Sequence, residues 1–253
     1  MTELVHFSVS GGVATLTLDS PPNRNALSAA LMEQLSSGLA AAVAEDAVRV
    51  IVLTHTGRVF CSGADLKGTA AAQQAGDMPI ASVPHLLTAL AQSPKPVIAR
   101  IGGPARAGGI GLIAACDIAL AARSATFAFT EVRLGVVPAV ISIPVLPLLQ
   151  PQAARELFLT GEVFDATRAA EIGLLTRVVE DADLDAEVAR YAEMLALGAP
   201  GALAAAKDLL AHPSTDYAAM SALSADRFAG PEGREGVAAF TQKRRPSWAP
   251  PAP

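Results

Sequence analysis

The feature that most constrains the fold of this chain is a regular change from short apolar runs to segments with helical periodicity. Apolar runs bounded by turn-forming residues predict strands. The predicted strands are residues 6–10, 13–18, 48–54, 97–101 and 117–121. Helical periodicity predicts helices over about 28–45 and 83–92, one that ends near 115, and mostly helix from about 152. Strands that alternate with helices, followed by helices alone, predict an α/β fold with a helical C-terminal part.

Local signals support two of these elements. Gly11-Gly12 separates the first two apolar runs, which is typical of a hairpin turn. Ser28 precedes the first helical segment and is a candidate N-cap, because its hydroxyl can accept a hydrogen bond from a free backbone N–H.

Two turns rich in small residues follow predicted strands, at residues 60–67 and 106–111. Small side chains let a ligand approach the backbone closely, and the second turn opens a helix whose first N–H groups lack partners. Either turn alone also fits a plain tight connection. The second resembles a dinucleotide-binding loop with Glu131 as its acidic residue, but the patterns G-x-G-x-x-G and G-K-[ST] are absent from it.

Composition argues against several classes of function. Hydrophobic residues make up 51% of the 253 residues, so we expect a sizeable core. Aromatic residues make up only 4% and the net charge is −5, which argues against nucleic acid as a partner. No apolar run reaches the roughly 20 residues of a membrane span, and residues 1–6 lack a signal-peptide pattern. We therefore expect a cytoplasmic protein that does not bind membranes.

The cysteines and histidines predict no metal site and no disulfide framework. Cys61 and Cys116 could form one disulfide in principle, but no secretory pattern of cysteines is visible. Cys116 lies in an apolar run and is predicted to be a buried thiol. His55 and His85 show no metal-like pairing with another histidine, a cysteine or a carboxylate, so we expect no metal.

Four motifs in order resemble the enoyl-CoA hydratase/isomerase (crotonase) superfamily. They are A-L after Asn25, S-G-A-D-L at 62–66, A-G-G-x-G-L-x-A-A-C-D at 107–117 and T-E-V-R-L-G-V-V-P at 130–138. The resemblance runs from about Ala14 to the tail at 240–244, and the set is highly specific although no single motif is. The third motif, combined with E-V-R-L-G-x-x-P-A-x-I-S at 131–142, resembles the methylglutaconyl-CoA hydratase-like branch.

This resemblance implies a spiral of ββα units followed by a helical region that forms trimers. Residues 1–195 would be the spiral core with the coenzyme A and oxyanion sites, and residues 196–253 the helical C-terminal region. The implied substrate is an acyl-CoA thioester, so coenzyme A arrives with the substrate and no separate cofactor is expected. The implied assembly is a homotrimer or a hexamer made of two trimers.

The resemblance also implies an oxyanion hole made by the backbone N–H groups of Ala64 and Gly108. Deprotonation or hydration beside a thioester pushes negative charge onto its oxygen, and losing one such donor typically costs about 10²–10³-fold in rate. Ala107 stands where the family has the first of three glycines, a small departure that keeps the Gly108 donor.

Further residues match the family's substrate-binding positions. The backbone of the first turn corresponds to the adenine pocket, and the second turn completes the set. The matching residues are Ser62, Gly63, Ala64, Asp65, Leu66, Gly108 and Gly109. Arg24, Lys67 and Lys243 match positions that meet the phosphates of coenzyme A, Lys243 from a neighbouring subunit. Each of these three is otherwise a solvated surface charge.

The carboxylates decide which chemistry the resemblance allows. Typical hydratases of the family carry two glutamates; Glu131 matches the second, but Gly111 stands at the position of the first. Glu131 is thus the candidate acid/base group, and partial burial should raise its pKa. One carboxylate can activate water for addition at Cβ, or move a proton from Cα to Cγ. We rank enoyl-CoA hydratase first, enoyl-CoA isomerase second and a catalytically weak acyl-CoA binding protein third.

Three other polar residues lie within these motifs. Asp117 is predicted to be a structural hydrogen-bonding group, and Asp65 to hold its loop through side-chain-to-backbone bonds. Arg106 lies two residues before Gly108 and has two open interpretations. If it points inward, it could pair with a distal carboxylate on a glutaconyl-type substrate; if outward, it is a solvated charge.

Overall fold

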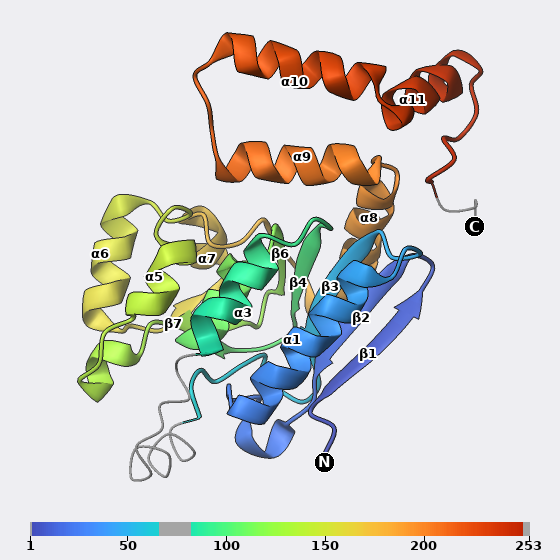
Figure 1. Cartoon of the computed structure of the whole chain (residues 1–253). Coiled ribbons are helices and arrows are strands. Elements are labelled where there is room, and N and C mark those ends of the chain that lie inside the picture. Colours follow the sequence, from blue (N-terminus) through green and yellow to red (C-terminus); the bar gives the residue numbers. More distant parts are fainter. Residues whose placement is uncertain (1, 66–81, 250–253) are drawn as a thin grey trace.

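A six-stranded sheet forms the centre of the fold (Figure 1). The computed structural model describes residues 2–65 and 82–249. The strands are β1 (Val5–Ser10), β2 (Val13–Leu18), β3 (Val50–His55), β4 (Val97–Ile101), β6 (Ile118–Ala122) and β9 (Arg177–Val179). Their order is β1-β2-β3-β4-β6-β9, with β1 antiparallel to β2 and every later pair parallel. The predicted hairpin at Gly11-Gly12 is confirmed.

The alternation of side chains along β2 divides the core between the two faces of this sheet. Ala14 and Leu16 are fully buried in the larger core, together with side chains of α1 and α3. Val13 belongs to a second apolar cluster on the opposite face, where Val52 meets Val188 of α8. These three helices are α1 (Ala29–Ala44), α3 (Ser82–Ala91) and α8 (Leu184–Ala196). Both faces of the sheet are therefore packed, as expected for parallel strands.

A second, three-stranded sheet positions the functional loops. It consists of β5 (Ala105–Arg106), β7 (Thr126–Ala128) and β8 (Phe164–Asp165), in the order β5-β7-β8. β5 is parallel to β7, and β7 is antiparallel to β8. Sequence patterns missed all three strands, because two or three residues are too short to show a period.

Short helices connect these strands around the larger core. They are η1 (Pro21–Asn23), α4 (Gly108–Ala114), η3 (Glu131–Leu134), α5 (Ala139–Val145), α6 (Pro151–Thr160), α7 (Ala166–Glu171) and η4 (Asp181–Asp183). The predicted N-cap of α1 is confirmed, since the Ser28 hydroxyl accepts a hydrogen bond from the Leu31 N–H at 3.3 Å. Cys61 is buried and Cys116 only partly so, and both are free thiols rather than a disulfide. Burial raises the pKa of Cys61 to about 12.

The last three helices lie apart from these layers, at one end of the molecule (Figure 1). They are α9 (Pro200–Ala211), α10 (Tyr217–Ala229) and α11 (Pro231–Thr241). The Glu232 carboxylate accepts hydrogen bonds from the N–H groups of Gly201 and Ala202, which joins α11 to the start of α9. The α/β class with a helical C-terminal region is thus confirmed.

Within residues 2–65 and 82–249, no single helix has the length and apolar character needed to cross a membrane. One bent pair, Asp181–Ala196 with Pro200–Ala211, passes that test of length and composition together, across a bend of 105°.

Asn25 holds the first functional loop in place. It is fully buried, with φ at 54°. Its amide nitrogen donates to Thr56 O at 3.1 Å and Val59 O at 2.8 Å, and its amide oxygen accepts from the Ser20 N–H at 2.7 Å. Asparagine tolerates this left-handed conformation better than most residues.

We predict that Asn25→Ala lowers the free energy of unfolding by about 2–4 kcal/mol, because three partly buried backbone groups lose their partner. Urea denaturation followed by circular dichroism measures this loss. Asn23→Ala is the matched control, since Asn23 is partly exposed and its side chain accepts one bond, from the Ala26 N–H at 3.3 Å. A loss at Asn25 no larger than the loss at Asn23 would contradict the assigned role.

Candidate active site

The two glycine-rich turns predicted from the sequence lie side by side. Cys61 forms a parallel bridge with Ala105, and the Arg106 N–H donates to Cys61 O at 3.0 Å. On the other side of the first turn, Leu27 bridges Ala64, and the Leu27 N–H donates to Gly63 O at 2.8 Å. Three segments far apart in sequence therefore run parallel at one edge of the fold.

Gly63 is the point at which these turns touch. Its φ is +90°, and a Cβ added to it would lie 2.9 Å from Ala107 Cβ and 3.1 Å from Arg106 O. The same added atom would lie 3.5 Å from Gly108 N. Only glycine fits both this conformation and this space. The close approach brings Ala64, which follows Gly63, next to the turn that ends at Gly108.

Two backbone N–H groups are available at this junction. Gly108 is the first residue of α4, where an N–H has no acceptor within its own helix. Neither the Ala64 N–H nor the Gly108 N–H donates a hydrogen bond to another residue in the described ranges. Two neighbouring free donors can bind one developing oxyanion. Their predicted role as an oxyanion hole remains a prediction.

Ala107 has an unusual backbone conformation for alanine. Its φ is 49° and its ψ is −119°, a region that glycine adopts readily and residues with a Cβ avoid. The Ala107 N–H donates to Ala128 O at 3.1 Å, which joins the turn to the end of β7. Replacement of a glycine by Ala107 is therefore not a small departure for the backbone, although it keeps Gly108 in place.

Glu131 stands at the end of the neighbouring strand. Arg106 and Ala128, the last residues of β5 and β7, lie opposite each other. Gly108 follows two residues after the end of β5, and Glu131 follows three residues after the end of β7, so both leave the same edge of this sheet. The side chain is half-buried, and its Oε2 atom is buried with no hydrogen-bond partner in the described part of the chain. Burial raises the pKa of Glu131 above its ordinary value of 4.5, and a hydrogen bond from its own backbone N–H lowers it by less. The predicted direction of this pKa shift is confirmed.

The structure gives different surroundings to the residues expected to bind coenzyme A. Arg24 is exposed. It lies beside the first turn, since its carbonyl accepts a hydrogen bond from the Ser62 N–H at 3.1 Å. Gly109 is buried, and a Cβ there would lie 2.7 Å from Cys61 O. Lys243 is exposed after α11, in the separate C-terminal helices. Asp65 closes the described part of this turn, and Leu66 and Lys67 lie outside the described residues.

Arg106 follows neither of its two proposed orientations. The guanidinium donates to Ala105 O at 2.9 Å, to Thr126 O at 2.6 Å and to Thr126 Oγ1 at 3.0 Å. It therefore ties β5 to β7 and lies half-buried, and this burial lowers the pKa of Arg106. Asp117 is structural as predicted, since its carboxylate accepts from the Val97 N–H at 2.7 Å and pairs with Lys207.

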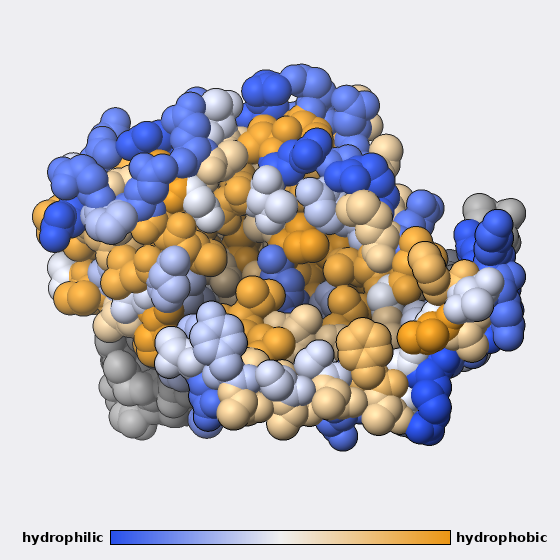
Figure 2. Space-filling model, turned by 90° about the horizontal axis from the view of Figure 1, so that it is seen from above, coloured by the Kyte–Doolittle hydropathy of each residue, from blue (hydrophilic) through white to orange (hydrophobic). Residues whose placement is uncertain are grey.

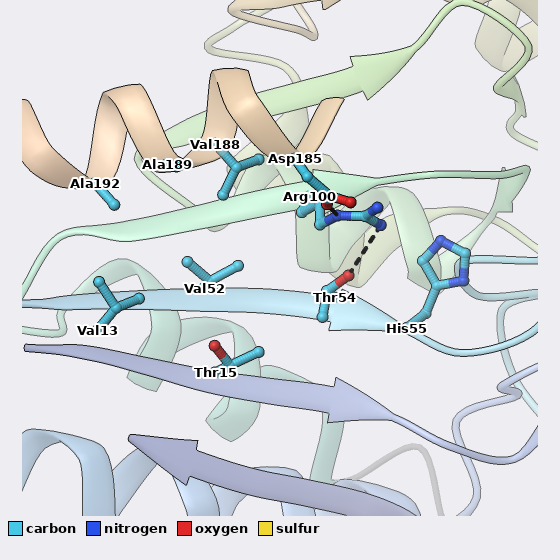
Figure 3. A pocket seen from close by; sticks show the side chains of 10 residues that line it. All are labelled: Val13, Thr15, Val52, Thr54, His55, Arg100, Asp185, Val188, Ala189 and Ala192. Atoms are coloured by element: carbon cyan, nitrogen blue, oxygen red, sulfur yellow. Dashed lines mark hydrogen bonds and ion pairs between the residues drawn. The ribbon is translucent and has the colours of Figure 1, made fainter. Parts of the chain in front are cut away.

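A cavity of about 490 Å³ lies away from these turns, between β2, β3, β4 and α8 (Figure 3). Figure 3 shows its polar end, where Arg100 bonds Thr54 and pairs with Asp185 and His55 lies nearby. Burial lowers the pKa of His55, whose Nε2 accepts from the Gly102 N–H at 3.1 Å. Arg100, Thr54 and Asp185 already bond one another, and none of the side chains at this end belongs to the two turns. The described residues contain no cluster of side chains fit to hold a metal ion.

Known proteins of similar sequence and structure match this chain over nearly its whole length. The family model described as enoyl-CoA hydratase/isomerase matches residues 8–251. A probable enoyl-CoA hydratase of Rhodobacter capsulatus is 36% identical over 250 residues, which is 96% of this chain and 96% of that one. The crystal structure of an enoyl-CoA hydratase from Mycobacterium smegmatis is 33% identical and covers 98% and 99% of the two chains, with a TM-score of 0.90. Pseudomonas aeruginosa AtuE is 35% identical and covers 98% and 100%, with a TM-score of 0.91.

We predict that Ala107→Gly raises the melting temperature by a few degrees. Relief of about 1–3 kcal/mol of backbone strain should exceed the roughly 0.4–1 kcal/mol that glycine adds through the flexibility of the unfolded chain. Differential scanning calorimetry measures the shift. Ala105→Gly is the matched control and should lower the melting temperature, because Ala105 is fully buried and has no positive φ. A drop at both positions would contradict strain at Ala107.

Proposed function

This chain belongs to the enoyl-CoA hydratase/isomerase family, and from that premise we propose that it adds water to a 2-enoyl-CoA thioester. The observation that carries the proposal is the Glu131 carboxylate, half-buried and with one oxygen unpartnered, emerging beside the turn that presents the Gly108 N–H. A carboxylate with a raised pKa is suited to proton transfer near neutral pH.

In this proposal the Ala64 and Gly108 N–H groups bind the thioester oxygen. Addition at Cβ moves electrons through Cα and the carbonyl carbon onto that oxygen, which becomes an enolate. Donors aimed at the place where charge develops lower the barrier more than donors that bind the substrate and transition state equally. Gly63 supports this role because it lets the two turns approach within van der Waals distance.

Glu131 then serves as both base and acid. Its carboxylate takes a proton from water as the water oxygen bonds to Cβ, and it returns that proton to Cα as the enolate collapses. The net reaction adds one water molecule, and Glu131 ends in its starting state. The sequence offers no second glutamate at the matching position, where Gly111 stands.

A second candidate function is double-bond isomerisation on the same scaffold. It is favoured by the packing around Gly111, where a Cβ would lie 2.6 Å from Ile141 Cγ2. An isomerase needs no bound water, since one carboxylate removes a proton from Cα and returns it to Cγ. A catalytically weak acyl-CoA binding protein is the outcome if neither reaction is found.

We also propose that the chain assembles as a homotrimer or as two such trimers. Large apolar side chains are exposed on the C-terminal helices, including Leu210 (84%), Tyr217 (89%), Phe228 (69%) and Phe240 (87%). Figure 2 looks onto the end of the molecule that carries these helices and shows hydrophobic surface in a hollow bordered by hydrophilic residues. Burying one such side chain contributes about 1.5–3 kcal/mol. In this assembly Lys243 of one subunit meets the coenzyme A phosphates bound to its neighbour.

We predict that Glu131→Gln lowers turnover at least 10²-fold on both 2-enoyl-CoA and 3-enoyl-CoA substrates. In the wild type, kcat/KM should rise with pH through the raised pKa of Glu131, because only the carboxylate form accepts a proton. Loss of the enoyl-thioester absorbance measures hydration, and its appearance from a 3-enoyl-CoA measures isomerisation. Glu162→Gln, at an exposed glutamate, is the control. Unchanged turnover in Glu131→Gln would exclude this residue as the base.

We predict that replacing Leu210 and Phe240 together by serine converts the assembly into monomers, because both side chains lose the apolar contacts of the interface. Sedimentation velocity should give three or six times the chain mass of 25.8 kDa for the wild type and about one chain mass for the variant. Val9→Ser, on the edge strand β1, should leave the sedimentation coefficient unchanged. A monomeric wild type would rule out the proposed assembly.

A further inference from the structure

The contact between Gly111 and Ile141 controls how much room lies beside the candidate site. We propose that Ile141 is a specificity-determining residue, which fills the space for a second acid/base side chain and so limits hydration relative to isomerisation. This inference rests on the proposed function, because it assumes that the two turns and Glu131 form the reaction site.

The packing at Gly111 leaves no room for a side chain. A Cβ on Gly111 would lie 2.6 Å from Ile141 Cγ2, 3.2 Å from Ile141 Cβ and 3.5 Å from Leu87 Cδ1. Contacts below 3.0 Å require movement, and a β-branched side chain in a helix has little freedom at χ1. Gly111, Ile141 and Leu87 are all buried. Ile141 therefore occupies the volume into which any residue at position 111 would point.

Position 111 belongs to the face of α4 that carries the candidate oxyanion donor. Residues three apart in a helix lie on the same face, so a side chain at 111 would stand one turn beyond Gly108. A Cβ on Gly108 would lie 2.8 Å from Leu27 Cδ1 and 3.8 Å from Gly63 Cα, which places this face against the first turn. A carboxylate at 111 would therefore extend along the side of α4 on which the thioester oxygen is proposed to bind.

The segment that brings Ile141 to this position begins at Glu131. The Val136 N–H donates to Glu131 O at 3.1 Å, and the chain turns at Gly135, with φ at 74°, before α5 begins after Pro138. α5 then packs Ile141 onto α4. The same stretch of chain thus supplies the carboxylate of Glu131 and places Ile141 where a second carboxylate, at position 111, would need space.

The chemical consequence differs between the two candidate reactions. Hydration needs a water molecule held at Cβ, and a second carboxylate would help to orient and deprotonate it. Isomerisation needs only one group that moves a proton between Cα and Cγ. An apolar Ile141 against Gly111 excludes a water-binding group from that position, whereas Glu131 stays available for proton transfer, so it lowers hydration more than isomerisation.

The first test measures the packing by thermal denaturation. We expect Gly111→Ala to lower the melting temperature in the wild type, although alanine normally stabilises a helix relative to glycine. In an Ile141→Ala background the same change should raise the melting temperature, because the contact at 2.6 Å is gone. Ile141→Val is the matched control, since valine keeps a methyl group at the Cγ2 position and should give no rescue. A stabilising effect of Gly111→Ala in the wild type would overturn the steric argument.

The second test measures the ratio of hydration to isomerisation with matched 2-enoyl-CoA and 3-enoyl-CoA substrates. We expect Gly111→Glu with Ile141→Ala to raise this ratio at least 10-fold over Ile141→Ala alone, within the range of one added acid/base group. Gly111→Glu alone should lower the melting temperature and give no such gain. If the variant with Gly111→Glu and Ile141→Ala does not fold, the same measurement is made on Gly111→Asp with Ile141→Ala, because the aspartate side chain is one methylene shorter.

Two outcomes would overturn the inference alone. A folded double variant whose ratio stays within about twofold of Ile141→Ala would show that Ile141 does not limit hydration, and so would an equal gain from Gly111→Glu without the second change. Failure of the proposed function looks different, because Glu131→Gln would then retain wild-type turnover. In that case the melting temperatures would still decide whether Ile141 fills the space at Gly111.

Discussion

The candidate site depends on the hydrogen bonds that align four short parallel segments. Leu27 donates to Gly63 O, Arg106 to Cys61 O and Ala107 to Ala128 O, so each segment holds the next one in register. The ends of parallel segments meet at one edge, which places the Ala64 turn, the Gly108 turn and the loop of Glu131 together. These segments are too short to be stable alone, and they depend on the rest of the fold, with its six-stranded sheet and helices, for stability.

Several groups in this region are left without the partners that a folded chain normally provides. The Ala64 and Gly108 N–H groups and Glu131 Oε2 have none in the described residues, and Ala107 has a strained backbone. Unsatisfied and strained groups persist only where their surroundings fix them. The surroundings here are well bonded, since buried Asn25 makes three hydrogen bonds and the Arg106 guanidinium makes three more, two of them to Thr126 of β7. The hydrogen bonds of Asn25 and Arg106 thus stabilise the backbone next to the groups that have no partner.

The sequence predicted local features well and long-range contacts poorly. The Gly11-Gly12 hairpin, the Ser28 cap, the strand 97–101 and the raised pKa of Glu131 are confirmed, because each follows from nearby residues or from a specific motif. β5, β7, β8 and β9 were missed, since their pairing joins segments that are distant in sequence; β8 and β9 interrupt the stretch predicted to be mostly helix. In the sequence, Asn25 stands out only as the residue before the first motif, and no local signal shows that its amide would reach Thr56 and Val59.

Gly111 shows most clearly how sequence and structure inform each other. A comparison of motifs finds a glycine where a glutamate would stand, and so indicates a missing group. The structure adds that the space is filled, because Ile141 arrives from a helix thirty residues further along the chain and lies where the side chain would begin. A missing group could be restored by one substitution, whereas a filled position requires two coordinated changes in α4 and α5. In the proposed function, the packing between these two helices therefore matters as much as the carboxylate of Glu131.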